Sequence, residues 1–132
     1  MKKKITYKIK EKNKFKTSLI NYLNSYKRFC FLDSNRSSKN NSFEFLCALC
    51  LNEKKSKSIE NLSDLDKIIE SKKWIFGHIS YDKKNSIENL SSKNYDGISF
   101  PDLNFFVPDL LIKYSENKLS FLFDSLSANY VK

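Results

Sequence analysis

Short apolar runs rich in aromatic residues recur along this chain of 132 residues, and polar clusters separate them. Three of these runs, at residues 29–32, 74–81 and 119–123, have the length and the residue types of β-strands. Between the runs, apolar residues recur every three or four positions, which is the spacing of an amphipathic helix. The sequence therefore predicts an α+β fold, with three or four strands in antiparallel-type sheet layers crossed by short helices.

The apolar spacing predicts three helices. They cover about residues 17–27, 43–51 and 63–72, and a serine or threonine stands at or beside each expected start. Such a hydroxyl can accept a hydrogen bond from the free backbone amides of the first turn. Ser42 is the expected cap of the second helix, and Ser63 that of the third.

Residues with special backbone preferences mark the ends of other elements. Asp82 is expected to cap a helical turn over residues 83–88. Pro101 and Pro108 are confined to strand ends, edges or bulges, because proline cannot donate a hydrogen bond to a neighbouring strand. Residues 115–118 predict a hairpin turn before the last apolar run.

The positive charge is concentrated near the N-terminus. The chain has 24 Lys and Arg against 15 Asp and Glu, so its formal net charge is +9. Residues 1–16 hold eight lysines and one glutamate, which is +7, and 9 − 7 leaves +2 for the rest of the chain. We therefore separate residues 1–16, a lysine-rich N-terminal strand or arm, from a domain formed by residues 17–132.

Three interpretations of these lysines are open. The first is a lysine-rich composition of the kind that an AT-rich gene encodes, which implies no binding function. The second is a basic arm that contacts nucleic acid or another anionic surface. The third is a strand with its lysines on the solvent side, since Lys4 and Lys8 alternate with Ile5 and Tyr7. Only two arginines are present, and arginine is preferred for bidentate phosphate contacts, so the sequence argues against a nucleic acid partner.

Several classes of protein are excluded by composition. No run of about 18 apolar residues is present, and the N-terminal lysines do not lead into a signal peptide, so we expect no membrane partner. Three cysteines, an odd number, are most simply kept as thiols in a reducing compartment, and we expect a cytoplasmic protein. With only two glycines, the chain has no Gly-rich phosphate-binding loop.

Cysteine spacing offers one candidate for metal or redox chemistry. Cys47 and Cys50 are spaced as CxxC, and with Cys30 and His78 they could form a Cys₃His zinc site. Redox pairs of this spacing open a helix, whereas this pair lies near an expected helix end, so we favour buried structural cysteines and a packed His78. Ser34 has no base nearby in sequence. We therefore expect neither a catalytic residue nor a metal site in the chain.

Two aromatic segments, 74–82 and 100–108, contain the arrangements G-x-x-x-Y-D and F-P-D-L-x-F-F-x-P. The residues at the defining positions are Gly77, Tyr81, Asp82, Pro101, Phe105 and Pro108. Together with residues 29–34, which are similar to a Leu-Leu-Glu-Ser segment, they resemble the N-terminal region of the chorismate-utilising synthases. These are component I of aminodeoxychorismate synthase and of anthranilate synthase. The resemblance covers about residues 15–125, and it is closer to the aminodeoxychorismate branch.

The resemblance implies a fold and a set of partners. Residues 17–132 would be an N-terminal-like domain of anthranilate synthase component I and part of the α/β/β/α sandwich of the family. In the family, the groups that bind chorismate and Mg²⁺ lie in a C-terminal catalytic segment, and this chain stops at Lys132 without it. We therefore expect a noncatalytic chain that is inactive alone and holds no cofactor itself. Its partners would be the C-terminal chorismate-binding segment and a glutamine amidotransferase subunit.

The implied activity of the whole enzyme is the amination of chorismate with glutamine-derived ammonia for para-aminobenzoate and folate biosynthesis. Anthranilate synthase, in tryptophan biosynthesis, is the alternative. Leu32, Asp33 and Ser34 match the family's Leu-Glu-Ser, whose serine and nearby backbone hold the amino-acid group of tryptophan, so tryptophan is a further implied ligand. Asp33 is one methylene shorter than the family's glutamate. A stand-alone module for an aromatic amino acid and a small basic nucleic-acid-binding protein are the remaining alternatives.

Overall fold

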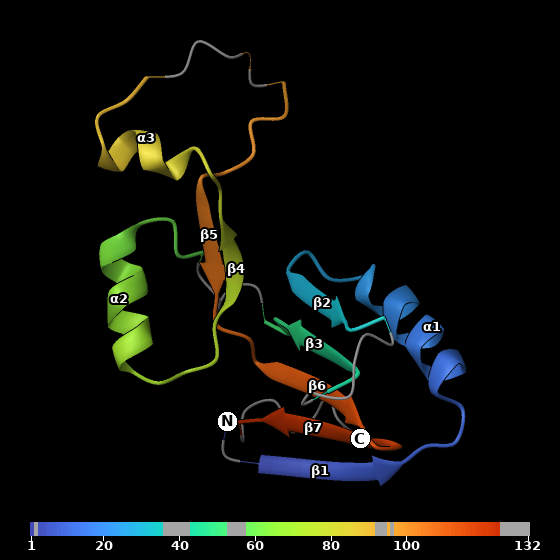
Figure 1. The fold of residues 1–132 in the computed structure, drawn as a ribbon. Coiled ribbons are helices and arrows are strands. Elements are labelled where there is room, and N and C mark those ends of the chain that lie inside the picture. Colours follow the sequence, from blue (N-terminus) through green and yellow to red (C-terminus); the bar gives the residue numbers. More distant parts are fainter. Residues whose placement is uncertain (2, 36–42, 53–57, 92–94, 96, 125–132) are drawn as a thin grey trace. The chain divides into compact units, whose positions relative to one another are not determined.

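The computed structural model describes residues 1, 3–35, 43–52, 58–91, 95 and 97–124 (Figure 1). The chain forms two compact units, and one is inserted into the sequence of the other. Unit 1 consists of Met1–Ser56 and Pro108–Lys132, and unit 2 consists of Lys57–Val107. No helix in the described part of the chain is long and apolar enough to cross a bilayer.

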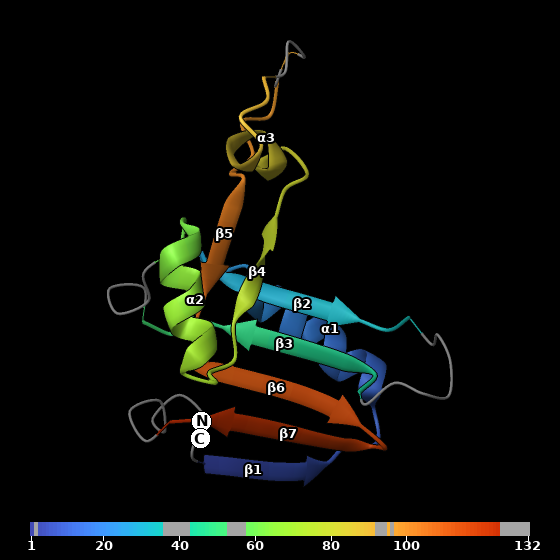
Figure 2. The same ribbon diagram turned by 60° about the vertical axis from the view of Figure 1, so that its left-hand side comes forward.

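Unit 1 is built on a five-stranded sheet in which every strand pairs antiparallel to its neighbours. Its elements are β1 (Lys3–Lys8), α1 (Lys12–Leu23), β2 (Phe29–Asp33), β3 (Phe45–Leu49), β6 (Leu110–Ser115) and β7 (Lys118–Phe123). The strand order is β1-β7-β6-β3-β2, as Figure 2 shows, so β1 and β2 are the two edges. β3 therefore pairs with β6, although the whole of unit 2 separates them in sequence.

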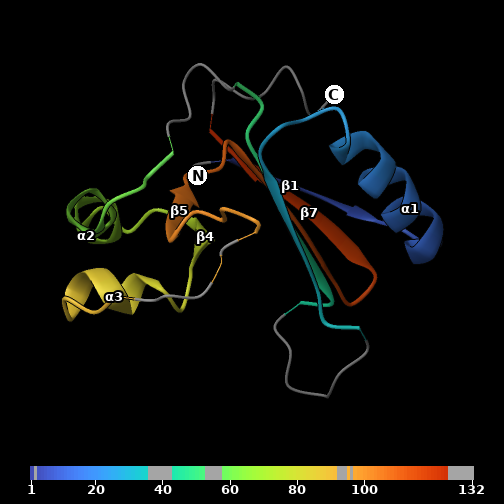
Figure 3. The same cartoon turned by 90° about the horizontal axis from the view of Figure 1, so that it is seen from above.

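Helix α1 covers one face of this sheet (Figure 3). Leu19 and Leu23 of the helix are buried against alternate residues of the strands, because successive side chains of a strand point to opposite faces. The buried strand residues of this core are Phe45, Cys47, Leu49, Leu110, Ile112, Tyr114, Leu119 and Phe123. Each large apolar side chain removed from water in this way contributes roughly 1.5–3 kcal/mol, so this face is the main source of stability in unit 1.

Unit 2 consists of α2 (Leu62–Glu70), β4 (Phe76–Ile79), α3 (Lys83–Ile87) and β5 (Leu103–Phe106). Strands β4 and β5 pair antiparallel in a two-stranded sheet. Leu65 of α2 packs with Ile59 and Leu103 in a small core. The Asn61 side chain accepts a hydrogen bond from the Asp64 backbone amide at 2.9 Å and starts α2.

The structure confirms the α+β fold class with antiparallel sheets and short helices. The three apolar runs of the sequence correspond to β2, β4 and β7, with bounds that differ by a few residues, and the predicted hairpin turn connects β6 to β7. The described residues form seven strands rather than the three or four expected. Both prolines lie outside the strands: Pro101 precedes β5, and Pro108 lies between β5 and β6.

The helix predicted over residues 43–51 is wrong, because Phe45–Leu49 is strand β3. β3 lies inside the sheet between β2 and β6, and all five of its side chains are buried. A strand buried on both faces lacks the alternation of apolar and polar residues that identifies a half-exposed strand. Its apolar run therefore matches a helical spacing equally well. The predicted cap, Ser42, lies outside the described residues.

The first helix begins at Lys12, five positions before the predicted start, and ends at Leu23. Phe15 packs on the core below α1 and continues the stripe of Leu19 and Leu23 by one turn. The surrounding lysines concealed this turn in the sequence. The boundary expected between residues 16 and 17 consequently falls inside α1. The third helix begins at Leu62, and its cap is Asn61 rather than Ser63.

Candidate functional site

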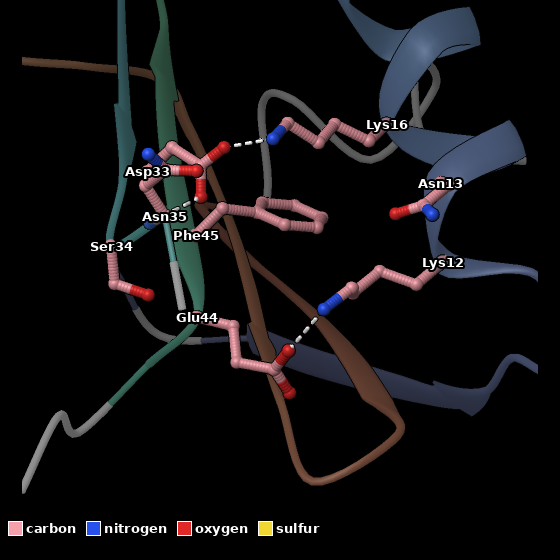
Figure 4. Close-up of a pocket in the computed structure, with 8 residues that line it drawn as sticks. All are labelled: Lys12, Asn13, Lys16, Asp33, Ser34, Asn35, Glu44 and Phe45. Atoms are coloured by element: carbon pink, nitrogen blue, oxygen red, sulfur yellow. Dashed lines mark hydrogen bonds and ion pairs between the residues drawn. The ribbon is translucent and has the colours of Figure 1, made fainter. Parts of the chain in front are cut away.

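A pocket of about 260 Å³ lies between the first two turns of α1 and the neighbouring ends of β2 and β3 (Figure 4). It is lined by Lys12, Asn13, Lys16, Asp33, Ser34, Asn35, Glu44 and Phe45. Asp33 and Ser34 are two of the three residues that the sequence assigned to an amino-acid pocket. Both line the pocket: Asp33 faces Lys16 of α1, whereas Ser34 lies on the strand side, away from the lysines (Figure 4).

Two ion pairs cross this pocket from the helix to the strands. Lys12 Nζ lies 2.6 Å from Glu44 Oε2, and Lys16 Nζ pairs with Asp33 Oδ2. All four side chains are partly withdrawn from solvent, between 28% and 43% exposed, so these charges are screened less than those of a fully exposed pair. The pocket thus presents two ammonium and two carboxylate groups, a set that matches the two charges of an α-amino acid.

Backbone hydrogen bonds hold the strand ends of the pocket in place. The Ser34 amide donates to the Glu44 carbonyl at 2.9 Å, which continues the pairing of β2 with β3. The Asn35 amide donates to Asp33 Oδ1 at 3.0 Å, and Asn35 has a left-handed backbone with φ of 46°. Asparagine tolerates this conformation better than most residues. Both carboxylate oxygens of Asp33 therefore have a partner: Oδ1 accepts a hydrogen bond from the Asn35 amide, and Oδ2 pairs with the Lys16 ammonium.

Phe45, the aromatic residue in the pocket lining, belongs to a stack of aromatic rings. The Phe45 ring is parallel to Tyr114, with centroids 5.1 Å apart, and also stacks on Phe15 and Phe31. Burial raises the pKa of Tyr114, the Glu44 carboxylate raises it further, and the Lys12 ammonium opposes both effects. The Tyr114 hydroxyl donates to Asn117 Oδ1 at 3.1 Å.

Leu32 lies elsewhere. It pairs with Leu46 across β2 and β3, whereas Asp33 pairs with Phe45, so Leu32 points to the face of the sheet opposite α1. Leu32 is 46% exposed and is not part of the pocket lining. Of the predicted set, Asp33 and Ser34 share the pocket and Leu32 does not.

In unit 2 the two motif segments are in direct contact. Gly77 of β4 lies opposite Phe105 of β5, and a Cβ atom on Gly77 would be 2.0 Å from the Asn104 carbonyl oxygen and 2.5 Å from Phe105 Cα. No other residue type fits there without moving backbone. Phe105 also exchanges two backbone hydrogen bonds with Ile59. The glycine of one motif, Gly77, is thus required because the strand of the other motif lies against it.

Side chains continue this contact beyond the strands. His78 Nε2 lies 2.9 Å from the Pro101 carbonyl, and its ring stacks on Phe100 with centroids 4.3 Å apart. The Ser80 hydroxyl donates to Asp102 Oδ1 at 2.8 Å. The His78 side chain therefore connects segment 74–82 to segment 100–108.

The remaining motif residues have structural surroundings of different kinds. Tyr81 is 79% exposed, and the Lys84 ammonium lies 3.7 Å from its ring centroid. Asp82 precedes α3 as its N-cap residue, although its side chain makes no capping hydrogen bond. Pro108 is buried and precedes Asp109, whose Oδ2 accepts hydrogen bonds from the backbone amides of Leu51 and Asn52.

The cysteines do not assemble a metal centre among the described residues, in which no group of three or more His, Cys, Asp or Glu side chains is placed to hold an ion. We assign no Mg²⁺ or zinc chemistry to them. Cys47 and Cys50 are both buried, Cys47 in the middle of β3 and Cys50 directly after it, rather than at a helix start. Burial raises the pKa of Cys47 to about 12, and the nearby Cys30 contributes in the same direction, so Cys47 stays a thiol at neutral pH.

Lys12, Lys16 and Glu44 are the site residues that the sequence did not single out. Lys12 and Lys16 are spaced i, i+4 and so share one face of α1, but this was hidden because the helix was expected to begin after them. Glu44 was placed inside a predicted helix. Comparison of the chain with protein-family models, with curated proteins and with solved structures gave no match.

Proposed function

We propose that this chain is the noncatalytic N-terminal segment of aminodeoxychorismate synthase component I. The whole enzyme aminates chorismate with glutamine-derived ammonia in para-aminobenzoate and folate biosynthesis. In this proposal the chorismate and Mg²⁺ sites belong to a C-terminal chorismate-binding segment, and the ammonia comes from a glutamine amidotransferase subunit. The present chain supplies a scaffold and a surface for those partners.

The observation that carries the proposal is the contact of β4 with β5. The resemblance rests on segments 74–82 and 100–108, and these two segments pair in one register, with Gly77 against Phe105. A steric requirement for glycine at this position gives a physical reason for the motif.

The residue pattern of the sheet in unit 1 also supports the proposed sandwich. The face opposite α1 carries Leu32, Leu46, Ala48, Leu111 and Leu122, together with Lys113 and Ser120. Leu46, Ala48 and Leu111 are buried, whereas Leu32 on the edge strand β2 is 46% exposed and can still take an apolar partner. We propose that the second sheet includes strands of the catalytic segment.

Association of the two segments tests this proposal. The chain is mixed with the chorismate-binding segment of an aminodeoxychorismate synthase component I and analysed by size-exclusion chromatography. We expect one co-eluting species, and we expect Leu32→Glu to abolish it because a carboxylate would enter an apolar contact. Leu62→Glu is the matched control, since Leu62 is similarly exposed, at 38%, but lies on α2. Separate elution of the wild-type chain contradicts the proposal.

We further propose that the pocket of unit 1 binds the amino-acid group of tryptophan. Lys12 and Lys16 offer cations to its carboxylate, Asp33 and Glu44 offer anions to its ammonium, and Phe45 provides an aromatic wall. The shorter side chain of Asp33 still reaches Lys16 from the end of β2. The ligand would share these ion pairs rather than displace them.

Calorimetric titration with tryptophan tests this pocket. We expect heat of binding from the wild-type chain and none from Ser34→Phe, because the phenyl ring would fill the pocket. Ser91→Phe is the control, since Ser91 is exposed and lies in unit 2. Equal binding by both variants, or none by the wild type, would overturn the assignment.

A further inference from the structure

Strand β1 is one edge of the sheet in unit 1, and β7 is its single neighbour among the described strands. The Ile9 amide donates to the Asn117 carbonyl at 3.1 Å, and Ile9 follows directly on the ladder in which Lys8 lies opposite Lys118. In an antiparallel ladder the residues that bond to the partner alternate with residues whose amide and carbonyl point away from it. Lys4, Thr6 and Lys8 therefore direct their backbone groups to the open edge.

The same alternation sorts the side chains of β1 onto two faces. Lys4, Thr6 and Lys8 lie on the face that also carries Lys118, which is directly opposite Lys8. Both lysines are exposed, and no ion pair of Lys4, Lys8 or Lys118 is found within the described part of the chain. Like charges directly opposite each other destabilise a sheet. The described part of the chain thus provides no anionic partner for the lysines of this edge.

The other face of β1 carries Lys3, Ile5 and Tyr7, and its two apolar side chains are incompletely covered. Ile5 and Tyr7 are 36% and 49% exposed, although the Tyr7 ring contacts the edge of Phe121 with centroids 5.9 Å apart. A strand laid against β1 would extend this face and bury more of both side chains. The edge thus offers three things in register: free backbone groups, cations on one face and apolar surface on the other.

We propose that the open edge of β1 binds an extended acidic peptide segment of a partner protein as an additional strand. Its backbone pairs with the amides and carbonyls of Lys4, Thr6 and Lys8, as in other cases of strand addition. Its acidic side chains, at alternate positions, face Lys4 and Lys8, and the apolar side chains between them cover Ile5 and Tyr7.

Two other occupants fit this edge less well. A second copy paired antiparallel about Thr6 would set Lys4 opposite Lys8 twice, so the lysines oppose self-association. Single-stranded nucleic acid needs aromatic side chains next to its cations, and the lysine face of β1 presents Thr6 between the two lysines. The aromatic Tyr7 lies on the opposite face.

Fluorescence anisotropy with a labelled octapeptide of alternating Glu and Val tests the proposal on the full chain. We expect saturable binding that weakens as salt is added, because the charges are exposed. The double variant Lys4→Glu, Lys8→Glu should weaken binding by roughly tenfold or more, on the scale of paired cross-strand charges. An octapeptide of alternating Lys and Val should not bind.

The backbone contribution is tested by Thr6→Pro, which removes an outward amide and leaves the pairing with β7 intact. We expect it to abolish binding of the Glu-Val peptide. Thr6→Val is the matched control, since it also loses the hydroxyl contact with Ser120 but keeps the amide, and it should bind as the wild type does. Full binding by Thr6→Pro, no binding by the wild type, or tighter binding of an oligouridine than of the peptide would each overturn the proposal.

Discussion

At the scale of single residues, left-handed backbone conformations identify where the sequence is not optimal for its turns. The hairpin between β6 and β7 has a two-residue loop, Glu116 and Asn117, with φ of 51° and 60°. Positive φ at both positions defines a type I′ turn, which favours Asn or Gly at each. Asn117 fits this preference, whereas Glu116 has a strained backbone.

Replacing Glu116 by asparagine should therefore stabilise unit 1. We expect Glu116→Asn to raise the free energy of unfolding by about 0.5–1 kcal/mol, measured by urea denaturation. Glu116→Ala removes the same charge without the preference for positive φ, and it should bring no gain. If both variants shift the midpoint equally, the backbone explanation is wrong.

The sequence located only part of the candidate site at this scale. Asp33 and Ser34 follow an apolar run directly, so their position at a strand end could be predicted. The partners of the site could not, because Lys12 and Glu44 are 32 positions apart and meet only when α1 lies on the sheet. No local pattern contains such a pairing.

At the scale of elements, the predictions succeeded where one face of an element is exposed and failed where neither is. β2 and β7 have partly exposed faces and were identified by residue type and alternation. β3 is buried on both faces and was taken for a helix. The first turn of α1 was missed for a different reason: lysines surround Phe15, the residue of this turn that packs on the core, and so hide the apolar stripe.

The pairing of β4 with β5 gives a prediction for the two glycines of the chain. Gly77→Ala should destabilise unit 2 by about 3 kcal/mol, because its Cβ would collide with backbone atoms of β5. Gly97→Ala is a natural control. Its Cβ would approach only the exposed Tyr95 ring, at 3.1 Å, and that side chain can move aside.

The fluorescence of Trp74, which stacks on Phe76 in unit 2, reports this unfolding directly. We expect a lower urea midpoint for Gly77→Ala and an unchanged one for Gly97→Ala. Equal midpoints for Gly77→Ala and the wild type would show that β4 and β5 are not packed as described.

At the scale of the whole molecule, the net charge of +9 proved less informative than the distribution of apolar residues. Six of the eight lysines of residues 1–16 are divided between the edge strand β1 (Lys3, Lys4 and Lys8) and helix α1 (Lys12, Lys14 and Lys16). The division into two units was not predicted, because it depends on the pairing of Leu49 with Leu110 across an intervening unit. Such long-range pairings leave no periodic pattern in a sequence.

Burial of Cys47 makes the stability of unit 1 depend on alkaline pH. The thiol titrates near 9.0 when unfolded and at about 12 when folded, so above pH 9 the unfolded state releases a proton that the folded state retains. The free energy of unfolding should therefore fall as pH rises from 9 toward 12, by up to about 2 kcal/mol at pH 10.5.

Circular dichroism during urea denaturation at pH 8 and pH 10.5 measures this dependence. Cys47→Val has no titrating thiol, so its loss of stability over the same interval should be smaller, whatever its starting stability. The lysines titrate in both proteins, so their contribution to the change in the free energy of unfolding is the same and cancels in the comparison. Equal losses in the two proteins would mean that Cys47 is not held as a buried thiol.

The proposal that this chain completes an aminodeoxychorismate synthase is tested most directly by the amination of chorismate with ammonium as the nitrogen source. The chain, a chorismate-binding segment of component I and their mixture are each supplied with chorismate, ammonium and Mg²⁺, and the products are quantified. We predict that 4-amino-4-deoxychorismate forms in the mixture at a rate well above that of either protein alone, and that the chain alone forms none. Turnover by the chain alone, or a mixture no faster than the chorismate-binding segment, would contradict the account.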